Sequence, residues 1–272
     1  MKEQYVGDIG DFGKVLILKH LAGLGFKVGI NWVLTENDDR NDGKHRDYVD
    51  RVKYRGVNCL CCCDEEIFEK IIPLAKKEKN GRRIEDLENL IRGFSPKVVF
   101  YPRSRIYLVK GSERRNLDNE AYNELKPDFA DLVFFDPDNG IDNNNGTSSQ
   151  HVYISDMKRY WNRGQSLLIY HHLGKHKSHE KQIQEKVELL EDQFSESLVY
   201  SYRVCRGTAR VYLLCIQPHH AEKTLGKTTI LSIEPLMISK SKWKKLGKRC
   251  SKDHSARLAY SCDTTLFLRE QP

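Results

Sequence analysis

The chain has 272 residues, of which 39% are hydrophobic and 31% are charged, and its formal net charge is +7. This length suffices for one large α/β domain, alone or with a small appendage. No apolar run approaches the roughly 20 residues of a membrane helix, and the N-terminus carries acids and glycines where a signal peptide would need apolar residues. We therefore expect a cytoplasmic protein that makes no membrane contact.

Helix and strand patterns alternate through most of the chain. Apolar residues at helical spacing predict helices, and short apolar runs rich in β-branched and aromatic residues predict strands. In chain order, the patterns predict a helix at 11–24, strands at 28–34 and 57–62, helices at 64–76 and 84–91, strands at 98–101 and 106–109, a helix at 116–125, a strand at 132–135, a polar loop at 142–150, a strand at 166–170, a helix at 179–194, and strands at 198–204 and 209–217.

This alternation predicts a mostly parallel, Rossmann-like sheet that helices cover on both faces. The last two strands have only a short connection, so they should form an antiparallel pair at one end of the sheet. We expect residues 1–220 to form this domain and residues 221–272 to form a basic C-terminal extension. Between Lys240 and Arg257 the extension has eight basic residues and one acid, a charge that suits either nucleic acid or a solvated tail.

Cysteine usage excludes two further classes of protein. Four of the eight cysteines crowd together as Cys59, Cys61, Cys62 and Cys63. This crowding suits neither a disulfide framework nor the paired spacing of a zinc site. We interpret these residues as part of a buried strand in which cysteine serves as a small apolar residue.

Three of four short polar motifs stand where a Rossmann-like sheet binds its ligands, at the carboxyl ends of the strands. NDGKH, DPDNG and YHH each follow a predicted strand, and GDIGDFGK precedes the first helix. Acids at one sheet edge are costly to bury without a partner, so we expect the motifs to share one site. The candidate residues in these motifs are Asp8, Asp11, Lys14, Asp42, Lys44, Asp136, Asp138, Asn139 and His171.

Each motif also has a purely structural interpretation. DPDNG and NDG are both good turn sequences, and His171 alone would suit packing. Asp11 could be the N-cap of the first helix, whereas the glycines around it suit a backbone that approaches a ligand closely. The occurrence of three polar motifs directly after three strands favours the shared site.

The motifs carry two resemblances. GDIGDFGK, NDGKH and DPDNG, in this order, resemble a family of uncharacterised bacterial proteins over roughly residues 4–217, which implies no activity. More distantly, the order of elements is similar to that of the large-subunit ribosomal RNA adenine-N6 methyltransferases. Leu18-Lys19-His20 stands where that family has Leu-Lys-His, and Asp136-Pro137-Asp138-Asn139 stands where it has Asp-Pro-Pro-Tyr.

The second resemblance implies a methyltransferase-like fold and an S-adenosylmethionine-dependent enzyme that acts on RNA or DNA. It implies that Asp136 orients the acceptor, that Lys14 meets the carboxylate of the cofactor, and that Asp64 or Glu65 binds the cofactor's ribose. Because Asp-Asn replaces the family's Pro-Tyr, a ring that stacks on the base would have to come from Tyr170 or Tyr153.

Two other functions remain open at this point. The many carboxylates also suit a nuclease or phosphodiesterase that holds Mg²⁺ or Mn²⁺, with His171 as the base and Lys14 or Lys44 against a phosphate. A non-catalytic nucleic-acid-binding module on the same fold is the other alternative. The sequence leaves the oligomeric state undetermined.

Overall fold

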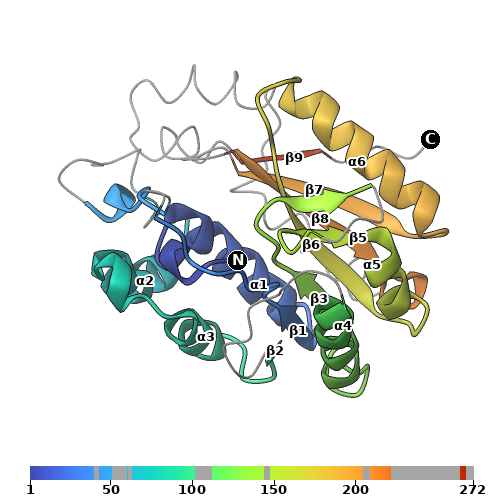
Figure 1. Ribbon diagram of the computed structural model, residues 1–272, viewed down its shortest axis with the longest axis horizontal. Helices are drawn as coiled ribbons and strands as arrows, with labels where there is room; N and C mark the ends of the chain where they lie inside the picture. The colour runs from blue at the N-terminus through green and yellow to red at the C-terminus, as the bar shows by residue number, and fades with distance from the viewer. Residues whose placement is uncertain are drawn as a thin grey trace.

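A computed structural model describes residues 1–39, 43–50, 60, 63–101, 112–143, 148–204, 209–221 and 264–267. Its centre is a seven-stranded sheet with the order β2-β1-β3-β6-β8-β7-β9 (Figure 1). The strands are β1 (Val28–Asn31), β2 (Val99–Tyr101), β3 (Leu132–Phe135), β6 (Ser166–His172), β7 (Leu198–Val204), β8 (Arg210–Ile216) and β9 (Thr264–Phe267).

The strand directions confirm an α/β protein with a mostly parallel sheet and an antiparallel pair. Strands β2, β1, β3 and β6 run parallel to one another. Strand β8 is antiparallel to both of its neighbours, β6 and β7. Because β8 is reversed, its amino end lies at the same sheet edge as the carboxyl ends of β3 and β6.

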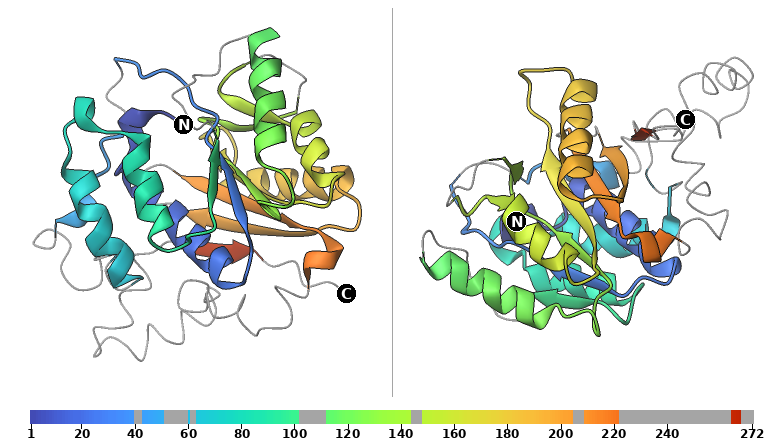
Figure 2. Two further views of the ribbon diagram at one scale, coloured as in Figure 1. Left: turned by 90° about the horizontal axis from the view of Figure 1, so that it is seen from below. Right: turned by 90° about the vertical axis from the view of Figure 1, so that its right-hand side faces the viewer.

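Helices cover both faces of the sheet (Figure 2). Residues of α1 (Ile9–Gly23), α2 (Glu65–Lys76) and α3 (Ile84–Arg92) pack in one hydrophobic core. Residues of α4 (Ser112–Glu124), α5 (Ile154–Trp161) and α6 (His179–Gln193) pack in a second core. Strand β3 explains why there are two cores, since Leu132 and Phe134 belong to the first and Val133 and Phe135 to the second. A strand covered on both faces reads as a continuous apolar run.

Helix α5 and a two-stranded sheet of β4 (Gly140–Asp142) and β5 (His151–Tyr153) were absent from the sequence prediction. The two strands flank the predicted polar loop at 142–150. The N-cap of α5 is Tyr153, whose backbone N–H donates to the Asp156 side chain at 3.2 Å. Tyrosine is not a usual N-cap residue, so the start signal was missing from the sequence.

Some predicted elements cannot be compared with the structure. The predicted strand at 106–109 lies outside the described residues, and so does the one at 57–62 apart from Leu60. The C-terminal extension lies outside them apart from Ala221 and β9. None of the helices in the described ranges combines the length and the apolar character that a membrane crossing requires.

Helix α1 begins at Ile9, and its N-cap is Asp8, whose carboxylate accepts the Gly10 N–H at 2.6 Å. The prediction that Asp11 caps this helix is therefore wrong, because the helix begins two residues before it. Gly7 has a φ of +83°, and a Cβ there would lie 2.6 Å from the backbone of Leu74 in α2. This glycine thus serves the close approach of α1 to α2 and not an approach to a ligand.

We predict that Gly7→Ala destabilises the fold more than Gly25→Ala does. Both glycines have a positive φ, which costs alanine roughly 1–2 kcal/mol. A Cβ at Gly25 would meet no atom within 4 Å, whereas one at Gly7 would overlap the backbone of α2. Overpacking adds about 1–3 kcal/mol, so denaturant unfolding should separate the two variants by that amount. Equal losses would show that the approach to α2 does not depend on glycine.

Candidate functional site

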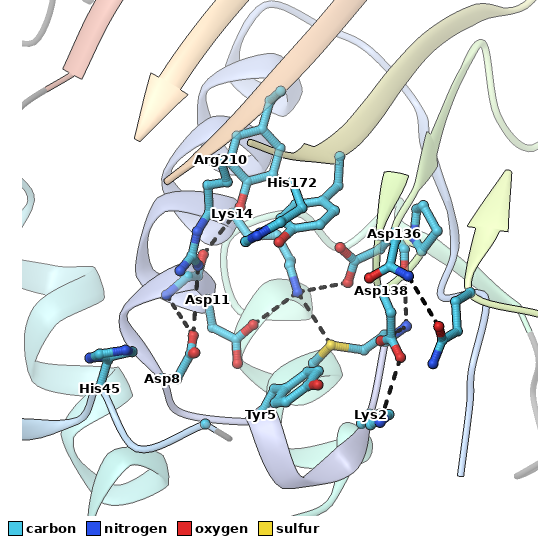
Figure 3. A pocket seen from close by; sticks show the side chains of 18 of the residues that line it. Lys2, Tyr5, Asp8, Asp11, Lys14, His45, Asp136, Asp138, His172 and Arg210 are labelled. Carbon is cyan, nitrogen blue, oxygen red and sulfur yellow. Dashed lines mark hydrogen bonds and ion pairs between the residues drawn. The ribbon is translucent and has the colours of Figure 1, made fainter. Parts of the chain in front are cut away.

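A cavity of about 300 Å³ lies at the sheet edge where β3 and β6 end and β8 begins (Figure 3). All four polar motifs contribute to its wall. The first helix contributes Asp8, Gly10, Asp11 and Lys14, the loop after β1 contributes Gly43, Lys44 and His45, the β3 end contributes Asp136, Pro137, Asp138 and Asn139, and the β6 end contributes Tyr170 and His172. Met1, Lys2, Tyr5, Gln150, Arg210 and Tyr212 complete the lining.

The innermost feature of this wall is a lysine between two aspartates. The Lys14 ammonium lies 2.9 Å from Asp11 Oδ1 and 2.7 Å from Asp136 Oδ2. All three residues are buried, with exposed fractions of 4% for Lys14, 2% for Asp11 and 3% for Asp136. Asp11 also accepts the Gly7 N–H at 2.9 Å through its other oxygen. The ion pairs therefore join helix α1 to the loop after β3.

The buried environment shifts the pKa of all three groups. It raises the pKa of the Asp11 and Asp136 carboxyl groups, although Lys14 opposes the shift in both. Burial alone would lower the pKa of Lys14, but the charges of Asp11 and Asp136 outweigh it, so this pKa lies above its ordinary value. Lys14 is also 5.2 Å from the ring centre of Trp32, which further favours its cationic form.

One oxygen of Asp136 remains available to a ligand. Oδ2 is held by Lys14, whereas no described residue donates a hydrogen bond to Oδ1. The backbone around it is also fixed, because the Asp136 N–H donates to the carbonyl of Asn31 and Pro137 fixes the next φ. Asp136 is thus a well-positioned acceptor on the cavity wall.

Aromatic rings line the cavity beside these charges. Side chains on a strand alternate between faces, so Tyr170 and His172 of β6 both line the cavity, together with Tyr212 of the neighbouring strand β8. The rings of Tyr170 and Tyr212 are 5.8 Å apart in an edge-to-face arrangement. Of the two tyrosines considered from the sequence, Tyr170 lines the cavity, while the Tyr153 hydroxyl contacts Ser148 instead.

Arg210 is a site residue that the sequence prediction missed. It is 4% exposed, and its Nη1 lies 3.8 Å from Asp8 Oδ1. A Cβ on Gly10 would coincide with this guanidinium, so Gly10 makes room for it. The signal in the sequence was an arginine at the start of an otherwise apolar strand, where a buried charge requires a partner.

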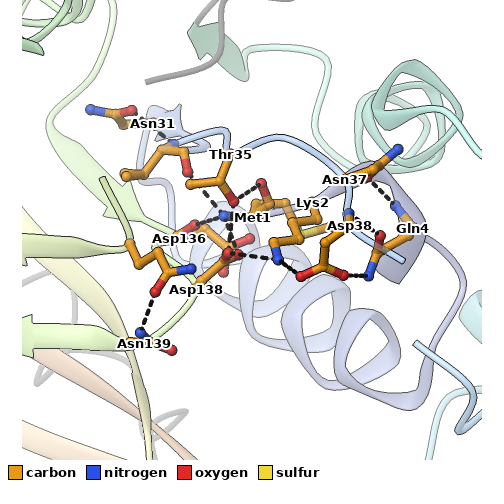
Figure 4. A network of polar contacts seen from close by, with 12 residues as sticks. Met1, Lys2, Gln4, Asn31, Thr35, Asn37, Asp38, Asp136, Asp138 and Asn139 are labelled. Carbon is orange, nitrogen blue, oxygen red and sulfur yellow. Dashed lines mark hydrogen bonds and ion pairs between the residues drawn. The ribbon is translucent and has the colours of Figure 1, made fainter. Parts of the chain in front are cut away.

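Asp138 holds the amino group of Met1 (Figure 4). The Met1 nitrogen lies 2.9 Å from Asp138 Oδ1, 2.9 Å from the Val33 carbonyl and 3.1 Å from the Asp136 carbonyl. Asp138 Oδ2 accepts a hydrogen bond from the Thr35 hydroxyl at 2.6 Å. Burial disfavours the carboxylate, but the ammonium and the hydroxyl outweigh it, so the pKa of Asp138 is lowered.

His171, predicted as a site histidine, does not line the cavity. Strand β6 continues to His172, so His171 points to the opposite side, where its Nδ1 accepts the Ile141 N–H at 3.1 Å. Burial, with help from Lys186, lowers the pKa of His171 to about 3. The ring is therefore a neutral structural acceptor, and His172 takes its place in the cavity.

Asp64 is also not part of this cavity. Its carboxylate caps α2 by accepting the Ile67 N–H at 3.0 Å, and it pairs with Lys19 at 2.8 Å. Asp42 lies outside the described residues, whereas Lys44 and Asn139 line the cavity as predicted. Within the described ranges, no three His, Cys, Asp or Glu side chains form a group that could hold a metal ion.

The sequence matches no protein-family model, and no curated protein is significantly similar to it. The chemical capability of the site therefore follows from its geometry. A small polar ligand would meet a fixed carboxylate oxygen, buried cations and aromatic rings within one pocket.

We predict that Lys14→Met destabilises the protein strongly and in a pH-dependent way. Removing one partner from a buried pair costs about 3–5 kcal/mol, which we expect in the free energy of unfolding at about pH 8. Without Lys14, the pKa of Asp11 and of Asp136 should rise further, so the folded state binds more protons than the unfolded chain. The loss should therefore shrink on acidification, by about 1.4 kcal/mol per pH unit for each extra proton bound.

Lys19→Met on the same helix is the control for this experiment. Its ion pairs with Asp64 and Glu66 are 31% exposed on the lysine side, and such pairs contribute about 0–1 kcal/mol. Denaturant unfolding at about pH 5 and pH 8 would compare the two variants. A Lys14→Met loss that is the same at both pH values would contradict the coupling of Lys14 to the two buried carboxylates.

Proposed function

We propose that the chain is a cytosolic, methyltransferase-like enzyme that uses S-adenosylmethionine and acts on nucleic acid. The observation that carries this proposal is the pair of Asp136 and Lys14. It joins an N-terminal helix motif to an acid motif at a strand end, and leaves one carboxylate oxygen of Asp136 facing a cavity with aromatic walls. The acid motif that begins at Asp136 is one of those on which the resemblance to adenine-N6 methyltransferases rests.

The described residues fit the polar groups of the cofactor. The cavity volume of about 300 Å³ lies within the range of small-molecule sites. Arg210 would meet a carboxylate, a role we move from Lys14 because two aspartates already neutralise Lys14.

In this proposal the cofactor supplies the methyl group, and the chain positions the acceptor. Positioning is the main requirement for a transfer of this kind. Asp136 Oδ1 would accept a hydrogen bond from the acceptor N–H, while Lys14 holds Oδ2 and prevents the carboxylate from rotating. Tyr170 would contact the face of the base. In the family this role belongs to the tyrosine of the Asp-Pro-Pro-Tyr motif, which this chain lacks.

The metal-dependent nuclease and the non-catalytic binding module are not favoured by a specific observation. The acids of the cavity face cations of the protein and not one another. Asp11 and Asp136 share Lys14, Asp138 binds an ammonium, and Asp8 lies near Arg210.

We predict that Asp136→Asn retains the fold and loses ligand affinity. Lys14 keeps its partner Asp11 in this variant, so the melting temperature should stay nearly unchanged or rise. In isothermal titration calorimetry, affinity for S-adenosylmethionine or for the acceptor should fall at least about tenfold, or roughly 1.4 kcal/mol. Methyl transfer from labelled cofactor to RNA or DNA should fall with it.

Asp128→Asn is the matched control, since Asp128 is exposed before the amino end of β3 and loses the same charge. It should bind both ligands as the unaltered chain does. If neither ligand binds the unaltered chain, or if Asp136→Asn loses stability but no affinity, then Asp136 is part of the scaffold and the proposed function fails.

A further inference from the structure

A run of basic residues begins three residues after His172, which lines the cavity. It comprises Lys175, His176, Lys177, His179 and Lys181, which we call the basic segment. It lies between β6 and the first turn of α6, and the connection passes beyond the end of the sheet (Figure 1). The basic segment therefore follows directly along the chain from a residue of the cavity wall.

The basic segment is held in place while its charges remain exposed. Gln182 accepts the Gly174 N–H at 2.9 Å and donates to the carbonyls of Gly174 and Lys177, both at 2.8 Å. Ser178 caps α6 by accepting the Lys181 N–H at 3.2 Å. Lys175, His176, Lys177 and Lys181 are all exposed. The backbone is therefore ordered in advance, which lowers the entropy cost of binding a partner.

Two lysines of the basic segment, Lys175 and Lys181, form no ion pair within the part of the chain that the structure describes. Lys177 of the same segment pairs with Glu185 at 2.8 Å, and Glu180 pairs with Arg203 at 2.6 Å. The amino end of α6 adds a partial positive charge to the same place.

The opposite side of the cavity mouth is also basic. Lys44 and His45 both line the cavity, and Lys44 is exposed and forms no ion pair among the described residues. Figure 3 shows His45 and His172 on two sides of the Asp8 and Arg210 pair. Lys44 is thus an exposed cation on the cavity wall, in addition to the buried Lys14 and Arg210.

We infer that the basic segment binds the phosphate backbone of a single-stranded or flipped-out stretch of nucleic acid, whose strand crosses the cavity mouth toward Lys44. Phosphates would contact the cations outside, and one base would enter the cavity beside Tyr170. A base that stays stacked in a duplex cannot enter an enclosed cavity, so the strand must be open at that point. This inference rests on the proposed function and specifies how its substrate is held.

The experiment reverses two charges of the basic segment with Lys175→Glu and Lys181→Glu in one chain. Its matched control is Lys97→Glu with Lys126→Glu, because both of these lysines are exposed, form no ion pair among the described residues and lie before the amino ends of β2 and β3. Affinity for a fluorescent single-stranded oligonucleotide is measured over a range of salt concentrations. The unaltered chain should bind, and the basic-segment variant should bind at least tenfold more weakly.

The salt dependence identifies the lost contacts as phosphate contacts. Each phosphate contact with a single strand contributes about 0.7 to the slope of log affinity against log salt, so two lost contacts should reduce the slope by about 1.4. The neutralising pair Lys175→Gln and Lys181→Gln should show a similar loss of slope with a smaller loss of affinity. A basic-segment variant with unchanged slope and affinity, or a control variant that loses as much, would overturn the inference.

Titration with S-adenosylmethionine distinguishes this result from the proposed function. The basic-segment variant should bind the cofactor as the unaltered chain does, because neither lysine lines the cavity. If the cofactor binds but the oligonucleotide slope is unchanged, only the docking surface is refuted. If the slope falls but the unaltered chain binds no cofactor, the docking surface is supported and the methyltransferase proposal fails.

Discussion

Lys14 is buried with its ammonium between two carboxylates, and this contact is the interaction around which the site is built. A lone ammonium or carboxylate at this depth would lose its hydration without compensation. Lys14 therefore fixes the position of helix α1 relative to the loop after β3. The same contact holds one carboxylate oxygen of Asp136 in place.

The antiparallel direction of β8 brings further residues to the same edge of the sheet as that contact. Were this strand parallel to β6, Arg210 and Tyr212 would lie away from the ligand edge of the sheet. In its antiparallel orientation, β8 contributes a buried cation and a ring to the edge where β3 and β6 contribute acids and a tyrosine. The Tyr212 hydroxyl donates to the Gly10 carbonyl at 3.2 Å, which closes the cavity against the first turn of α1.

The sequence predicted an element correctly where its local pattern of apolar residues matched its burial in the fold. The apolar run of β3 predicted both its bounds and the position of Asp136 directly after it. By contrast, the sequence could not show which of His171 and His172 lines the cavity. Neighbouring residues of a strand point to opposite faces of the sheet, so an error of one residue in the strand assigns the wrong histidine. Asp64 follows an apolar run as Asp136 does, but it serves as a helix cap, and only the three-dimensional contacts distinguish the two. Arg210 could not be assigned because its partner lies near the other end of the chain.

The separation of the site residues along the chain has a consequence for folding. Gly10 and Tyr212, which contact each other, are 202 positions apart, and closing so long a loop is slow because its entropy cost must be met before the contact stabilises anything. During synthesis the first helix emerges long before β8, so the cavity cannot form until β8 has paired with β6. A ligand that fills this cavity would therefore bind only chains in which the first helix and β8 have come together.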